Sequence, residues 1–113
     1  MFTIRVNSVF HISGRGTVLA GRVENGSARI GSRVALRTPK ISVIKELNGL
    51  ERNHENVSHA FAGEDVGILF RNLDPAMLIG GIELVKTEHE PHSWRVIDLI
   101  IEKAPKRWWE FWE

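Results

Sequence analysis

Arginine is the residue type in this 113-residue chain whose placement points most directly to chemistry. Arg15 stands between Gly14 and Gly16, which both accept a positive φ, so we expect a tight turn to present Arg15 at the surface. A guanidinium forms bidentate, charge-assisted hydrogen bonds with phosphate. We therefore predict an RNA-binding face, and its candidate residues are Arg15, Arg22, Arg29, Arg33 and Arg37.

The distribution of charge along the chain favours such a basic face. Residues 1–45 hold eight basic residues and one acidic residue, whereas residues 46–113 hold seven basic and thirteen acidic residues. Arg29, Arg33 and Arg37 would share the outer face of one strand if no kink occurs at Gly31-Ser32. A second interpretation stays open, in which these arginines are a solvated outer face paired to the acidic second half.

The sequence lacks the residues of most catalytic and metal sites. It has no cysteine, which excludes disulfides, thiolate catalysis and cysteine-ligated zinc. The pairs His54/His59 and His89/His92 each lack a third strong metal ligand, and no serine has an identifiable base. No Gly-x-x-x-x-Gly-Lys-Ser/Thr loop occurs. The sequence therefore predicts no enzyme activity, no metal and no cofactor.

Short runs of alternating polar and apolar residues predict about six strands. They fall near residues 2–6, 17–24, 30–37, 41–47, 65–71 and 82–86. Asn25-Gly26 predicts a hairpin turn, residues 48–59 predict a long surface loop, and Asp74-Pro75 predicts the start of a helical turn. Six strands with little helix favour a closed antiparallel barrel, which would leave no exposed sheet edge.

Several short motifs, most of them containing glycine, follow one another along the chain. They are Phe10-His-Ile-Ser-Gly-Arg-Gly-Thr-Val18, Gly21-Arg-Val-Glu-Asn-Gly26, Ile30-Gly31, Ala62-Gly-Glu-Asp-Val-Gly67, Leu78, Gly80 and Leu84. In order and spacing they resemble the second domain of elongation factor Tu and other translational GTPases. The resemblance implies a six-stranded, closed elongation-factor-type barrel over residues 1–86. Residues 87–113 would then be a linker and a C-terminal amphipathic, aromatic segment.

The resemblance also implies a class of partner. In elongation factor Tu this domain helps to hold the aminoacyl end of transfer RNA, and related factors use it against ribosomal RNA. Gly49 stands where the family's pocket has an arginine, and Asp65 stands where it has an amide. Because a carboxylate only accepts hydrogen bonds, we expect contact with the backbone of ribosomal RNA or tRNA rather than specific capture of an aminoacyl end.

The C-terminal segment is rich in aromatic residues. Ser93 could cap a helix that runs to Lys103, although the abundant Val and Ile of this run also suit a strand. The candidate partner-binding residues are Trp108, Trp109, Phe111 and Trp112. They could cover the chain's own barrel or dock a protein partner or a second copy. A membrane surface is the least favoured of these fates, because acidic residues flank the aromatics.

These observations predict a cytoplasmic, non-enzymatic binding module. The N-terminus has no signal-peptide pattern, and no apolar run approaches the roughly 20 residues that span a bilayer. The leading hypothesis is contact with RNA or the translation apparatus through the basic face. The alternative is a protein-interaction or assembly adaptor, in which the aromatic C-terminal segment recognises the partner.

Overall fold

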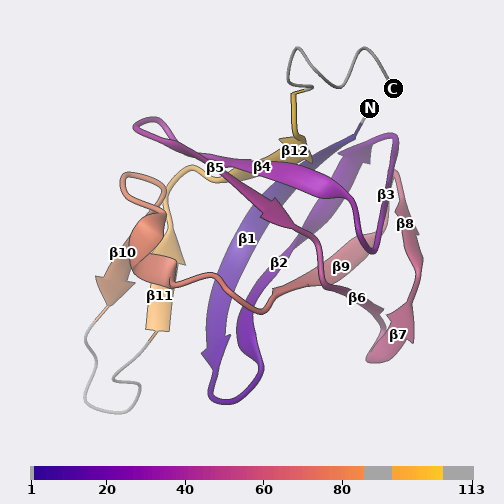
Figure 1. Cartoon of the computed structure of the whole chain (residues 1–113), viewed down its shortest axis with the longest axis horizontal. Coiled ribbons are helices and arrows are strands. Elements are labelled where there is room, and N and C mark those ends of the chain that lie inside the picture. Colours follow the sequence, from indigo (N-terminus) through magenta and orange to yellow (C-terminus); the bar gives the residue numbers. More distant parts are fainter. Residues whose placement is uncertain (1, 86–92, 106–113) are drawn as a thin grey trace.

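The computed structural model describes residues 2–85 and 93–105, which form an all-β fold with one short 3-10 helix (Figure 1). The helix η1 is Pro75–Met77. The strands are β1 (Thr3–Ile12), β2 (Gly16–Asn25), β3 (Ser27–Arg29), β4 (Arg33–Arg37), β5 (Ser42–Glu46), β6 (Gly49–Arg52), β7 (Glu55–Val57), β8 (His59–Phe61), β9 (Asp65–Phe70), β10 (Ile82–Val85), β11 (Ser93–Val96) and β12 (Ile100–Lys103).

Within the described residues, the main sheet is open, so the prediction of a closed barrel is wrong. Its strands pair antiparallel in the order β5-β4-β12-β1-β2-β9-β6-β7, with β10 and β11 attached beside β1. The reason lies at Leu47 and Asn48, which link the expected strand β5 to a strand, β6, that falls within the predicted loop. The part before this link, β5, pairs with β4, and the part after it, β6, pairs with β9. The pairing path therefore ends at β5 and at β7 instead of closing.

The predicted helical C-terminal extension is also wrong, because residues 93–103 form β11 and β12. Strand β12 lies between β1 and β4, with Ile101 opposite Ile4 on one side and Leu36 on the other. All three side chains are fully buried. Burying Ile101 against both neighbouring strands stabilises the extended form, and β-branched residues suit a pleated surface.

The turn at Gly14 to Gly16 is confirmed as the link of the β1–β2 hairpin. The backbone N–H of Arg15 donates to the carbonyl of Ile12 at 3.0 Å, and Gly14 has φ +80°. A Cβ on Gly16 would lie 2.5 Å from the carbonyl oxygen of Phe70. Glycine is therefore required at residue 16 both for its φ of +127° and for the close approach of the chain that follows β9.

The predicted hairpin at Asn25-Gly26 is wrong. Gly26 has φ +65° and turns the chain, but β3 leaves β2 and pairs with β8 in a separate two-stranded sheet. The predicted long loop is also wrong, because residues 49–57 form the β6–β7 hairpin around Asn53 and His54, which both have positive φ. The predicted helical start is confirmed, since Asp74 accepts a hydrogen bond from the N–H of Ala76 at 2.9 Å.

A single hydrophobic core fills the inside of the curved sheet. Its largest fully buried side chains are Phe70, Ile4, Leu19, Leu36, Leu47, Ile68, Leu78, Leu99 and Ile101. Thr17 is the one polar residue among the buried residues that the structure describes. Its hydroxyl donates to the backbone carbonyl of Leu73, which ties the start of β2 to the chain after β9. This bond fixes the strand ends from which the candidate site is built.

Candidate nucleic-acid interface

The structure distributes the predicted arginines over several elements. Arg15 lies in the β1–β2 turn, Arg22 lies on β2, and Arg29 lies on β3. Arg33 and Arg37 occupy the two ends of β4, where they flank three buried residues. Gly31 has φ +90° and separates β3 from β4, so the arginines do not form one stripe along a single strand.

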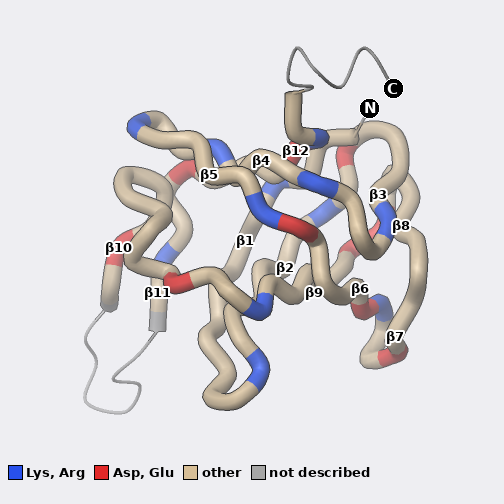
Figure 2. Tube along the Cα trace, in the orientation of Figure 1, with Lys and Arg blue, Asp and Glu red and all other residues tan. Residues whose placement is uncertain are grey.

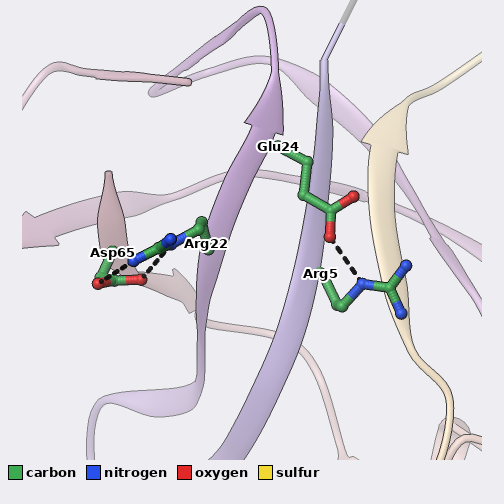
Figure 3. Close-up of polar contacts among 4 residues, drawn as sticks. All are labelled: Arg5, Arg22, Glu24 and Asp65. Atoms are coloured by element: carbon green, nitrogen blue, oxygen red, sulfur yellow. Dashed lines mark hydrogen bonds and ion pairs between the residues drawn. The ribbon is translucent and has the colours of Figure 1, made fainter. Parts of the chain in front are cut away.

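Two of these arginines are neutralised by acidic residues of the second half of the chain. Arg22 on β2 donates two hydrogen bonds to Asp65 on β9, at 3.1 and 3.3 Å (Figure 3). Arg37 donates to Glu102 on β12 at 2.7 Å. The hydrogen bond and charge of Arg22 lower the pKa of the Asp65 carboxyl. These pairs are those of a solvated outer face, the second interpretation of the basic residues.

Figure 2 shows the same mixing at the scale of the molecule. Lys and Arg alternate with Asp and Glu over the sheet instead of gathering on one side. A third pair, Arg5 to Glu24 at 2.7 Å, joins β1 to β2 (Figure 3). The Arg5–Glu24 pair lies within the first half of the chain, whereas the Arg22–Asp65 and Arg37–Glu102 pairs join the two halves and cancel part of the charge asymmetry.

An open pocket of about 570 Å³ lies beside the β1–β2 turn. Its polar lining comes from three separate segments, namely His11 near the end of β1, Arg15 in the turn, and Arg71 directly after β9. The Thr17 hydroxyl lies 3.3 Å from His11 Nδ1, and the N–H of Arg71 donates to the side-chain oxygen of Asn48 at 2.8 Å. The pocket is thus assembled on hydrogen-bonded strand ends.

We call this pocket the tip pocket, and its charged lining residues, Arg15 and Arg71, are both basic. No acidic residue is among its lining residues, and within residues 2–85 and 93–105 neither Arg15 nor Arg71 forms an ion pair. Arg71 was not among the sequence candidates. The signal that could have identified it is its position one residue after a buried strand that must pair beside the Gly14 to Gly16 turn.

Other predicted features have a narrower outcome. Among the described residues, no three His, Cys, Asp or Glu side chains come together as a possible metal site. No helix in the described part of the chain is long and apolar enough to cross a membrane. The predicted partner-binding residues Trp108, Trp109, Phe111 and Trp112 lie outside the described residues.

Comparison with solved structures finds proteins of similar fold. No family model matches the chain. Among solved structures, a bacterial selenocysteine-specific elongation factor, EF-Sec, is similar over 91% of this chain, with a TM-score of 0.65 and 25% sequence identity. The matched region is 14% of that factor's chain, so this chain corresponds to a small part of it. The similarity supports the resemblance noted in the motifs: this chain has an elongation factor Tu-like domain fold.

Proposed function

We propose that this chain is a non-catalytic, cytoplasmic module related to translation factors that binds the phosphate backbone of RNA through the tip pocket of His11, Arg15 and Arg71. The observation that carries the proposal is the pair of arginines without an acidic partner in the described part of the chain. Unpaired guanidinium groups can exchange their counterions for phosphates, whereas Arg22 must first leave Asp65.

The fold similarity supports the same class of partner. The selenocysteine-specific elongation factor is by name a translation factor, and the part of it that this chain resembles covers 14% of its length. The pocket makes contact with the backbone of ribosomal RNA or tRNA the simplest form of binding, because guanidinium groups recognise phosphate without reading bases. The proposal includes no specific recognition of an aminoacyl end.

The salt dependence of RNA binding tests this proposal. The slope of log K against log salt is negative, and for a single-stranded RNA each lost phosphate contact reduces its magnitude by about 0.7. The magnitude of the slope should therefore be smaller by about 1.4 in the variant carrying Arg15→Gln and Arg71→Gln, measured by fluorescence anisotropy with a labelled single-stranded RNA of mixed sequence. Glutamine keeps a long polar side chain, so the change removes charge with little effect on the fold.

Arg22→Gln provides a matched control, because it removes one positive charge that Asp65 already neutralises. The slope for this control should stay within the error of the unchanged protein. An unchanged slope in the double variant would contradict the proposal, as would binding that does not depend on salt at all. Replacing Trp108, Trp109 and Trp112 by alanine tests the adaptor alternative. If that alternative is right, the variant should lose a co-purified protein partner or its association with a second copy of the chain.

A further inference from the structure

The two-stranded sheet formed by β3 and β8 presents an unusual outer face. Ser27 lies opposite Phe61, Ala28 opposite Ala60, and Arg29 opposite His59. Both alanines are buried, and the residues on either side of them are exposed. Because residues directly opposite in an antiparallel pair point to the same side, Ser27, Arg29, His59 and Phe61 share the outer face.

Two aromatic rings lie together on this face. The rings of His59 and Phe61 are nearly parallel, with 14° between their planes and 6.3 Å between their centres. The Ser58 hydroxyl lies 2.9 Å from His59 Nδ1 and holds that ring in place. Phe61 is 54% exposed, so its ring faces water instead of the core. The two rings therefore stack on each other, and the exposed Phe61 ring offers an aromatic surface to a ligand.

The charges around these rings suit a negatively charged ligand. Within the described residues Arg29, which is opposite His59, forms no ion pair. The nearest acidic residue on the same turn, Glu64, accepts hydrogen bonds from the backbone N–H of Phe61 and from Arg52. These bonds lower the pKa of Glu64 and leave its charge compensated. The face therefore combines aromatic surface with one uncompensated cation.

We propose that this stacking face, made of Arg29, His59 and Phe61, binds an unstacked base of single-stranded RNA. The base stacks on the aromatic rings, and the Arg29 guanidinium contacts an adjoining phosphate. Aromatic side chains beside a cation are the usual means of holding single strands, since every base has a π-face. The inference rests on the proposed function and narrows it from RNA in general to RNA with an accessible single-stranded segment.

The stacking face and the tip pocket are separate sites. The ten residues of β2 lie between them, and at about 3.3 Å per residue they place the two sites roughly 30 Å apart. Figure 1 shows the β3–β8 pair at the opposite end of β2 from the β1–β2 turn. A substitution at one site therefore leaves the other site intact, and the two proposals can fail independently.

The test uses the full chain and a short oligouridylate, whose bases stack little on each other, carrying one fluorescent base 2-aminopurine, whose emission falls when the base stacks. Phe61→Ala should weaken binding roughly 5- to 150-fold, the usual effect of removing one stacking aromatic. It should also abolish most of the quenching. Phe61→Leu keeps apolar bulk without a ring, so it should show the same loss and serves if the alanine variant does not fold.

Phe10 offers a matched control, because it is 53% exposed on β1 and lies outside the stacking face. Phe10→Ala should leave binding and quenching unchanged. An abasic site in place of 2-aminopurine should weaken binding to the unchanged protein but not to Phe61→Ala. The stacking proposal is overturned if the unchanged protein binds base-containing and abasic strands equally. It is also overturned if Phe61→Ala binds RNA as well as the unchanged protein, which is the result expected if this face serves a protein partner instead.

The two proposals give different patterns of failure. If Phe61→Ala binds RNA normally while the Arg15 and Arg71 double variant shows the expected reduction in salt dependence, the stacking face is refuted and the tip pocket stands. If the double variant keeps its slope while Phe61→Ala binds weakly, the tip pocket is refuted and the stacking face stands. Arg29→Gln should reduce the magnitude of the slope of log K against log salt by about 0.7 without abolishing the quenching of 2-aminopurine.

Discussion

The hydroxyl of Thr17 gives the most direct test of how the tip pocket is held. Thr17 is fully buried at the start of β2, where it donates to the Leu73 carbonyl and lies 3.3 Å from His11 Nδ1. Thr17→Val keeps the shape of the side chain but removes the donor. A buried carbonyl left without its partner costs about 1–3 kcal/mol. The free energy of unfolding should fall by that amount.

The corresponding change in melting temperature follows from the size of the chain. An unfolding entropy of about 2.1 cal/mol/K per residue makes each kcal/mol worth about 4 °C in this 113-residue protein. Thr17→Val should therefore melt about 4–12 °C lower in a thermal unfolding scan followed by circular dichroism.

Thr3→Val is the matched control for this experiment. Thr3 lies at the start of β1, is only partly buried, and forms no side-chain hydrogen bond within the described residues. The same chemical change there should alter stability by less than about 0.5 kcal/mol. If Thr17→Val melts at the temperature of the unchanged protein, the buried hydroxyl does not stabilise the junction between β2 and the chain after β9, and the reasoning is refuted.

Three further predictions concern the sheet and its charges. Gly21→Ala should lower the free energy of unfolding by about 1–3 kcal/mol in urea titrations, because its Cβ would lie 2.2 Å from the backbone oxygen of Arg5. Gly67→Ala, whose Cβ meets only ordinary contacts from 3.5 Å, should change it by less than about 0.5 kcal/mol. The hydrogen bond and charge of Arg22 hold the pKa of Asp65 below its ordinary value, so the pair stabilises the fold at neutral pH and this stabilisation is lost as pH falls through the lowered pKa. Asp65→Asn should therefore flatten the acid limb of a melting-temperature profile, and it should steepen the salt slope of RNA binding by up to about 0.7 because it releases Arg22.

Features that depend on neighbouring residues could be predicted from the sequence. The turn around Arg15 follows from the two glycines that flank it, and the cap at Asp74 follows from a carboxylate placed before Pro75. Both the turn and the cap depend only on residues close to one another in the sequence. The longer strands among the first 86 residues were equally readable, because alternation marks a half-buried strand wherever its partner lies, whereas the short strands β3, β6, β7 and β8 were not predicted.

Pairing partners could not be predicted in the same way. Residues 27–29 pair with residues 59–61, which lie thirty residues away, and no local pattern names that partner. The segment 93–103 has apolar residues at positions that fit either a helix or a strand. It becomes β11 and β12 because Ile101 fills a place between β1 and β4 that only the folded sheet creates. The closure of the sheet failed as a prediction for the same reason.

The candidate site shows the same division between residue type and position. The sequence identified arginine as the important residue type, but pairing assigned Arg22 to Asp65 and left Arg15 beside an arginine that had not been considered, Arg71. The exposed ring of Phe61 escaped notice because a phenylalanine between alanines looks like part of a core strand. Whether the Phe61 ring is buried depends on which sheet β8 joins, and β8 joins the two-stranded sheet with β3, where the ring is exposed.

The ion pairs also explain why the two proposed sites lie at the ends of β2 and not along it. A central strand such as β2 has neighbours on both sides, so each outward charge of one sign can meet an opposite charge across the sheet, as Arg22 meets Asp65 and Glu24 meets Arg5. At the turn and at the β3–β8 pair, by contrast, Arg15 and Arg29 form no ion pair within the described residues, and Arg29 has His59 opposite it. Cations placed there keep their charge available. An RNA strand would therefore be held at two points about 30 Å apart, with a neutral stretch of sheet between them.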